Sequence, residues 1–357
     1  MQKFYQNKKV LVTGHSGFKG SWLVRILSGW GANVVGVSLP SDTHPNLFDV
    51  LKISDRTNKN YFTDIRDFNK IKEIMELEKP EIVFHLAAQP LVRDSYLDPL
   101  TTFSTNVLGT ANVLQAIKET NSVSSVVIIT TDKVYENKES SHPYQEVDAL
   151  GGYDPYSASK AAADIVANSY IQSFFNPKDY GVKHNTLVAI ARAGNVIGGG
   201  DWAKDRIIPD MIRAIFERKE AITIRSPKAI RPWQHVLESL RGYLMLGEQL
   251  YNGQKNISGA WNFGPNEESF VCVKDLVDKG IAILGRGVCR VVEDTSKHEA
   301  NLLKLDISKA ENILGWHPKW KLGDGLEATF DWYGHYYNNS KAIEELTNKQ
   351  IKLFFEC

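Results

Sequence analysis

Short apolar runs alternate with longer amphipathic stretches through the first half of the chain. Residues 9–13, 34–37 and 81–86 are rich in Val, Leu and Ile, which is typical of buried strands. Residues 18–30 and 68–77 instead place their apolar side chains at helical spacing. Strands that alternate with helices in this way predict parallel βαβ units.

The same alternation continues with a helix over 104–119 and a β-branched strand over 125–130. Ligands of such sheets bind beyond the carboxyl ends of the strands. We therefore predict an α/β fold with a Rossmann-type doubly wound parallel sheet. The functional site is expected at the carboxyl edge of that sheet.

After about residue 195 the pattern becomes mixed, and no low-complexity linker separates it from the first half. There we expect helices over 209–218, 235–250 and 273–284 and strands over 222–224 and 261–263. We predict a Rossmann domain over 1–190, to which some later segments return, and a smaller mixed α/β substrate-binding domain mainly over 191–335. The tail over 336–357 has no predicted role.

Composition limits the classes of function. The chain has 357 residues, of which 43% are hydrophobic and 24% charged, as in an ordinary globular protein. Lys plus Arg and Asp plus Glu both number 42, so charge gives no case for nucleic acid or a membrane surface as partner. The sequence shows neither an apolar signal segment nor a membrane-spanning run, and Cys272, Cys289 and Cys357 lack metal-ligand spacing. We expect a reduced cytoplasmic protein without a metal.

A glycine-rich loop lies between the first strand and the first long helix. Gly14, Gly17 and Gly20 have Gly-xx-Gly-xx-Gly spacing, with Phe18 and Lys19 inside the motif. Glycines there permit a tight turn and let a pyrophosphate approach the helix N-terminus. The alternative is a glycine-rich turn without a ligand, but the flanking strand and helix favour dinucleotide binding.

The choice between NAD and NADP rests on fewer residues. The usual acidic residue about 20 positions on would fall near 37–39, whereas the first acid is Asp42. Residues 34–51 contain no Lys or Arg for a 2′-phosphate, although Lys19 could serve one. Asp64 and Ile65 suit contact with adenine. We expect NAD, with NADP left open.

Two short motifs carry candidate chemistry. Tyr156 and Lys160 are four residues apart, so on a helix they project from one face. A cationic Lys beside a phenol stabilises phenolate and lowers the phenol pKa from its usual value of about 10. Thr131-Asp132-Lys133 directly follows the strand over 125–130 and adds acid and base groups at the expected site. Such a Tyr/Lys pair suits removal of a hydroxyl proton while the carbon loses hydride.

These motifs resemble a known family. Together with His85-Leu86-Ala87-Ala88-Gln89 and Asn106, they are similar to the extended short-chain dehydrogenase/reductase family. Further stretches resemble its NAD-dependent nucleotide-sugar 4,6-dehydratases, in particular the branch that acts on CDP-glucose: residues 14–22, 131–137, 150–156, 231–236 and 298–306. The dTDP-glucose branch has Glu where this chain has Lys133, and related epimerases lack the adjoining acid/base pair.

The resemblance implies a hydro-lyase that acts on CDP-glucose and recycles NAD, with Ala87 among the cofactor-binding residues. Tyr156 would take the proton of the 4-hydroxyl, held by Thr131, while Lys160 lowers the Tyr156 pKa and binds the nicotinamide ribose. Asp132 would protonate the departing 6-hydroxyl. Lys133 as the base at C5 is a hypothesis, because a lysine acts as a base only while neutral.

The nucleotide end of the substrate is expected in the second half. Arg192, Asn195, Arg206 and Arg231 are the candidate contacts, because guanidinium groups suit phosphate recognition. The resemblance also implies a homodimer or homotetramer and a role in deoxysugar and O-antigen biosynthesis. Alternatives are a nucleotide-sugar 4-epimerase, a sugar-nucleotide reductase, which would consume the cofactor, and a non-catalytic dinucleotide-binding regulator.

Overall fold

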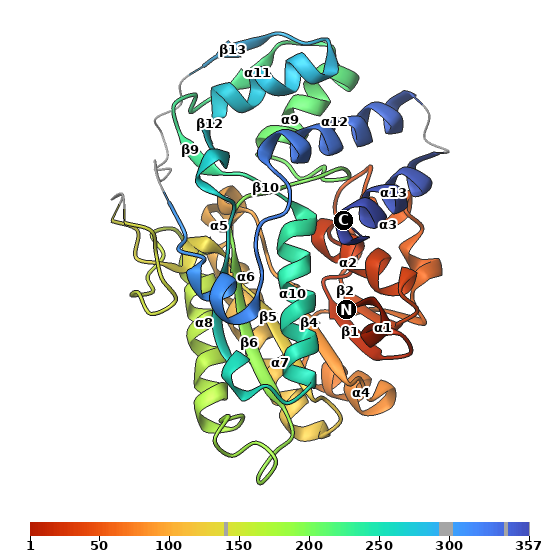
Figure 1. Ribbon diagram of the computed structural model, residues 1–357, viewed down its shortest axis with the longest axis vertical. Helices are drawn as coiled ribbons and strands as arrows, with labels where there is room; N and C mark the ends of the chain where they lie inside the picture. Colours follow the sequence, from red (N-terminus) through yellow and green to blue (C-terminus); the bar gives the residue numbers. More distant parts are fainter. Residues whose placement is uncertain (139–141, 293–302, 339–341, 357) are drawn as a thin grey trace.

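A seven-stranded parallel sheet forms the centre of the computed structural model (Figure 1). The structure describes residues 1–138, 142–292, 303–338 and 342–356. Every neighbouring pair of strands in this sheet is parallel. Their order across the sheet is β11 (Gly259–Phe263), β6 (Leu187–Ala193), β5 (Ser125–Ile129), β4 (Ile82–His85), β1 (Lys9–Thr13), β2 (Asn33–Ser38) and β3 (Lys59–Phe62). The predicted parallel sheet is confirmed.

Helices cover both faces of this sheet. Alternate strand residues such as Leu11 and Val126 pack on α4 (Phe68–Glu78), α7 (Gly109–Thr120) and α8 (Pro155–Ser173). The intervening residues, such as Val10 and Val127, pack on α2 (Phe18–Gly29) and α10 (Val236–Tyr251). Because side chains alternate along a strand, the nearly continuous apolar runs supply both cores, and the sheet is doubly wound as predicted.

The C-terminal part is interleaved with the first half. Strand β11 is an edge strand of the central sheet, and α10 packs on β5 and β6. The short strands pair as β7 (Val196–Ile197) with β10 (Gln234–His235), β8 (Ile222–Ile224) with β13 (Cys289–Val291), and β9 (Ile230–Pro232) with β12 (Phe270–Cys272). The remaining helices are α1 (Gln2–Tyr5), α3 (Leu47–Val50), α5 (Val92–Leu97), α6 (Pro99–Phe103), α9 (Ile207–Ile212), α11 (Val273–Leu284), α12 (Leu322–Asn338) and α13 (Ile343–Glu356). The boundary at residue 190 stays a prediction.

One predicted helix has an irregular start. Residues Ser104–Leu108 form a π-helical turn before α7, where a regular helix was expected from residue 104. Asn106 lies in that turn, and its amide hydrogen-bonds the backbone of Gln89 and the hydroxyl of Ser159. The wider turn places the Asn106 amide between the segment after β4 and helix α8. Such π-helical turns often occur at functional sites.

The tail, which had no predicted role, forms α13. Its Glu344 contacts Lys52 and Arg56 at 3.1 and 2.8 Å, and Phe354 packs edge-on against Trp320. Helix α13 therefore packs beside the N-terminal half of the chain (Figure 1). His298, in a stretch that carried part of the resemblance, lies outside the described residues.

Candidate active site

A cavity of about 1230 Å³ lies where the strands of the central sheet end. It is lined by the glycine loop, by the turn after β5, by the start of α8 and by the residues that follow β6. This is the edge predicted from the sequence. Among the described residues, no helix is long and apolar enough to cross a membrane, and no group of three His, Cys, Asp or Glu side chains could hold a metal.

The glycine loop fits a pyrophosphate. Gly14 has a φ of +74°, and a Cβ there would stand 2.7 Å from the backbone N of Ala87. A Cβ at Gly20 would meet the carbonyl oxygen of Gly14 at 2.0 Å, so the turn closes only with glycine. Gly17 is the N-cap of α2, and because it has no side chain it accepts no hydrogen bond there from the N–H groups of the first turn. Those N–H groups and the helix dipole suit the phosphates of NAD.

Asp64 and Ile65, the two residues predicted to contact adenine, line the cavity. The Asp64 carboxylate accepts hydrogen bonds from the backbone and guanidinium of Arg66, at 2.6 to 2.9 Å, which fix the turn after β3. These bonds, with the positive charge of Arg66, lower the pKa of Asp64 although its partial burial opposes the shift. Contact between adenine and these two residues stays a prediction.

The Lys19 side chain points toward α10. Its ammonium donates to the hydroxyl of Tyr243 on α10 at 3.2 Å. Burial, with the nearby charge of Arg206, lowers the pKa of Lys19 to about 8, while Asp132 opposes the shift. Lys19 therefore belongs to the catalytic end of the cavity. The ammonium thus has a partner other than a 2′-phosphate, which favours NAD over NADP.

Helix α8 presents Tyr156 and Lys160 to the cavity from its first turns. Asp154 begins the helix with a capping box, in which its carboxylate accepts from the Ser157 N–H at 3.0 Å. The Lys160 ammonium donates to the carbonyl of Ile129, the last residue of β5, at 2.8 Å. The predicted pair thus lies on one helix face and is fixed to the strand that carries the other motif.

Burial raises the pKa of Tyr156 to about 12, against a hydrogen bond with Thr131 and the charge of Arg206, which lower it. Burial also lowers the pKa of Lys160 to about 8. The groups that assist Tyr156 ionisation in this structure are therefore Thr131 and Arg206. That Lys160 lowers the pKa of Tyr156 stays a prediction.

The Thr131-Asp132-Lys133 motif forms a tight 3₁₀ turn beyond β5. Thr131 caps this turn, and its hydroxyl donates to the Asp132 carboxylate at 2.9 Å. Burial raises the pKa of Asp132, against the charges of Lys133, Arg231 and Lys19 and the bond from Thr131. A raised pKa favours the protonated acid, the form needed to give a proton to a leaving hydroxyl. Lys133 is half-buried and lines the same cavity.

Three of the four predicted substrate residues line the cavity: Asn195, Arg206 and Arg231. Arg206 is fixed by Asp201 at 2.8 Å. Arg192 is the exception, because its guanidinium forms a buried bidentate ion pair with Asp164 on α8. The prediction that Arg192 contacts substrate is wrong: its charge is already neutralised inside the protein.

The sequence interpretation missed further cavity residues. Asp205 accepts from Arg225 at 2.9 Å and contacts Arg93 at 3.6 Å, and all three line the cavity. Arg93 lies on α5 and Arg225 follows β8, so their spacing from Asp205 along the chain gave no signal.

The buried partner of Arg192, Asp164, was also missed. It follows Tyr156 and Lys160 at the next four-residue step on one helix face.

The arrangement can remove a proton from a hydroxyl, supply a proton from a buried acid and offer an amine as base. Tyr156, Asp132 and Lys133 would perform these steps within one cavity. Oxidation alone needs only the Tyr/Lys pair. The additional acid and amine therefore suit an elimination that accompanies it.

Known proteins share both sequence and fold with the chain. Residues 11–329 match the family described as GDP-mannose 4,6 dehydratase. A CDP-glucose 4,6-dehydratase from Salmonella typhimurium is 47% identical over 333 residues, which cover 93% of this chain and 92% of that protein. A solved dTDP-glucose 4,6-dehydratase from Streptomyces venezuelae, with NAD and TYD bound, is 25% identical with a TM-score of 0.77 and covers 94% of this chain and 99% of that chain.

A UDP-glucuronic acid 4-epimerase from Bacillus cereus, solved with UDP-glucuronic acid and NAD, has the same fold. It is 24% identical with a TM-score of 0.78 and covers 92% of this chain and 100% of that chain. Dehydratases and epimerases thus share this architecture, so the residues of the cavity must decide between the two chemistries.

Proposed function

The chain belongs to the GDP-mannose 4,6 dehydratase family, and on that premise we propose that it is an NAD-dependent hydro-lyase that converts CDP-D-glucose to CDP-4-keto-6-deoxy-D-glucose. The observation that carries the reaction is the buried Asp132 within the same cavity as Tyr156. The 47% identity to a CDP-glucose 4,6-dehydratase supports the choice of substrate.

The first stage oxidises C4 of the glucose. Tyr156 removes the proton of the 4-hydroxyl, and the Thr131 hydroxyl and the charge of Arg206 stabilise the resulting phenolate. The glycine loop would hold NAD, which would supply a hydride acceptor for C4 and a hydride donor for C6. Lys160 binds the nicotinamide ribose from the face of α8 that also carries Tyr156.

The second stage removes water across C5 and C6. A ketone at C4 acidifies the C5 proton, and Lys133 is the proposed base because it lines the cavity beside Asp132. Asp132 gives its proton to the departing 6-hydroxyl. Its burial, which raises its pKa, supports that role by keeping the carboxyl protonated at a higher pH than usual.

The nucleotide is proposed to lie along the cavity wall formed by Asn195, Arg206 and Arg231. Guanidinium groups can bind the diphosphate by paired hydrogen bonds. Ion pairs already order this wall, since Asp201 holds Arg206.

An exposed apolar surface supports the proposal of a homodimer or homotetramer. Leu97, Leu100 and Leu108 are 80%, 81% and 60% exposed, and Ile165 and Phe174 on or beside α8 are 56% and 42% exposed. Large apolar side chains in such numbers suit contact with a second copy. We place this assembly in the cytoplasm, where it would supply deoxysugars for lipopolysaccharide O-antigen.

The test is to incubate the purified protein with NAD and, separately, CDP-, dTDP- and UDP-glucose. With CDP-glucose, the near-ultraviolet absorbance that 4-keto-6-deoxy sugars develop in alkali should appear without net accumulation of reduced cofactor. Keto product from dTDP- or UDP-glucose alone would contradict the nucleotide assignment. CDP-galactose without a keto product would instead support the second candidate, a nucleotide-sugar 4-epimerase, which needs no acid for the 6-hydroxyl.

A further inference from the structure

A buried ion pair connects helix α8 to strand β6 below the catalytic residues. The Asp164 carboxylate accepts two hydrogen bonds from the Arg192 guanidinium, both at 2.8 Å. The two side chains are only 2% and 4% exposed. Asp164 lies one turn beyond Lys160 and two turns beyond Tyr156, so all three share one face of α8.

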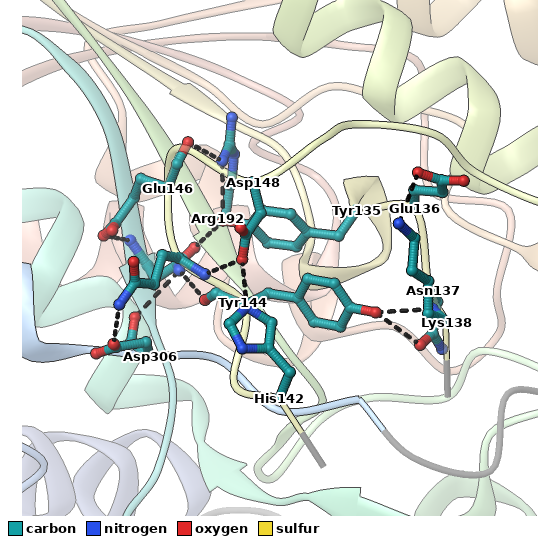
Figure 2. Close-up of polar contacts among 12 residues, drawn as sticks. Tyr135, Glu136, Asn137, Lys138, His142, Tyr144, Glu146, Asp148, Arg192 and Asp306 are labelled. Atoms are coloured by element: carbon teal, nitrogen blue, oxygen red, sulfur yellow. Dashed lines mark hydrogen bonds and ion pairs between the residues drawn. The ribbon is translucent and has the colours of Figure 1, made fainter. Parts of the chain in front are cut away.

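The same ion pair contacts the chain on both sides of the Thr131-Asp132-Lys133 turn. Before the turn, the Thr130 hydroxyl donates to the Asp164 carboxylate at 3.2 Å. After the turn, the guanidinium of Arg192 donates to the Tyr135 hydroxyl at 2.8 Å (Figure 2). One pair of charges therefore holds both flanks of the turn that carries Asp132.

The flank at Tyr135 is itself fixed in position. Its hydroxyl donates to the Asn262 side chain on β11 at 2.7 Å, and its ring stacks on Tyr144 with the centroids 5.1 Å apart. Arg192 also donates to the carbonyl of Glu146 at 3.1 Å, as Figure 2 shows. These contacts attach the loop after the catalytic turn to the edge strand β11 and to its neighbour β6.

We propose that Asp164 and Arg192 are positioning residues that hold the Thr131-Asp132-Lys133 turn in register with Tyr156. The inference rests on the proposed function, because it concerns how the groups for oxidation and the groups for elimination reach the same sugar. Helix α8 carries Tyr156 and Lys160, and the turn beyond β5 carries Asp132 and Lys133. The ion pair and its hydrogen bonds to both flanks fix the distance between these elements.

Stability alone does not account for the arrangement. Desolvation of a buried ion pair offsets most of its attraction, so an apolar pair of the same size would stabilise the fold about as well. Bidentate hydrogen bonds add what an apolar pair lacks, namely a fixed direction between the groups. Burial lowers the pKa of Arg192, but the hydrogen bonds that it donates to Asp164 and the charge of that carboxylate raise the pKa above its usual value, so the guanidinium stays charged.

Two mild substitutions separate positioning from folding, because they leave Asp164 and Arg192 paired. Thr130→Val removes the bond on one flank, and Tyr135→Phe removes the hydroxyl on the other. The matched controls are Thr329→Val and Tyr5→Phe, which remove buried hydroxyls bonded to the carbonyls of Gly325 and Leu244. None of these four residues lines the cavity.

The readout is a single turnover with CDP-glucose, in which nicotinamide absorbance reports oxidation and rapid-quench analysis of the 4-keto-6-deoxy product reports elimination. Because small misplacements of reacting groups are costly, each flank variant should slow elimination by about tenfold and oxidation by less than about twofold. Reduced cofactor then accumulates transiently, while the melting temperature matches that of the control variant.

The inference would be overturned if the ratio of the elimination rate to the oxidation rate in both flank variants equalled the wild-type ratio, whatever the total activity. The same experiment keeps the proposed function separate. Wild-type protein that makes no 4-keto-6-deoxy product would overturn the function, whereas wild-type product with unchanged ratios in the variants overturns only the positioning role.

Discussion

The substitution Gly194→Ala tests whether the Asp132 carboxyl must lie where the structure places it. Gly194 follows β6, and a Cβ added there would stand 2.8 Å from Oδ2 of Asp132 and 3.4 Å from Cγ of Pro232. Ordinary contact begins at 3.4 Å, so the carboxyl must retreat by about 0.6 Å, the difference between 3.4 and 2.8 Å. The contact with Pro232 is already at that limit, so Asp132 is the group that moves.

A shift of this size should affect elimination more than oxidation. A misplacement of about 1 Å can cost about 10²-fold in rate, so about 0.6 Å should cost on the order of tenfold, or about 1.4 kcal/mol in the barrier to elimination. Tyr156 and Lys160 lie on α8 and are not displaced, so oxidation of C4 should keep its rate.

The assay is a rapid-quench single turnover with CDP-glucose, in which nicotinamide absorbance and the keto product are followed together. We expect reduced cofactor to accumulate in Gly194→Ala before product forms. The control is Gly334→Ala in α12, where an added Cβ meets no described atom within 4 Å. Equal loss of both stages, or no loss of either, would refute the assignment of Asp132 as the acid.

Three further substitutions examine other residues of the account. Tyr156→Phe should lower kcat by about 10²- to 10⁴-fold because the base for the 4-hydroxyl is lost, and stopped-flow traces should show no reduced cofactor. Lys133→Ala should still oxidise C4 but lose exchange of the C5 proton with solvent; exchange at the wild-type rate would remove Lys133 as the base. His235 is buried, which lowers its pKa to about 3 from 6.5, so the unfolded chain binds a proton below pH 6.5 that the folded chain does not. Stability is therefore lost as pH falls from 6.5 toward 3, and His235→Asn, which keeps a helix-capping side chain, should weaken the dependence by about 2 kcal/mol at pH 5 in urea unfolding.

Local patterns predicted the parts of the site that lie close together in sequence. The loop from Gly14 to Gly20 needs only a strand, glycines and a helix, and the structure has all of them in that order. Thr131 directly follows β5, so its place at the carboxyl edge followed from the strand alone. The Tyr156 and Lys160 pair needed only a helix.

Arg192 shows where such reasoning fails. Val188, Ile190 and Arg192 alternate along β6 and share one face, which packs against α8. Asn195 lies beyond the end of the strand and lines the cavity. Arg192 and Asn195 are close in sequence, which suggested a common role. Because side chains alternate along a strand, however, Arg192 points toward Asp164 on α8, a partner that the sequence pattern did not identify.

Contacts between distant segments also escaped prediction. Lys19 lies within the glycine loop, so its position suggested the cofactor, yet its ammonium bonds to Tyr243 on α10. The tertiary fold sets that direction, because α10 covers the same face of the sheet as α2. Motif spacing predicts where the backbone of a residue lies. The partner of a long side chain such as Lys19 depends instead on tertiary packing, which the motif does not describe.

The central claim is that one sugar is oxidised at C4 and reduced at C6 within a single binding event. The most direct measurement uses CDP-glucose deuterated at C4 and locates the label in the product by mass spectrometry and NMR. The account predicts deuterium on C6 of the 4-keto-6-deoxy product, with none in free reduced cofactor. Label that stays on C4, as in an epimerised sugar, or that leaves with the cofactor, would contradict it.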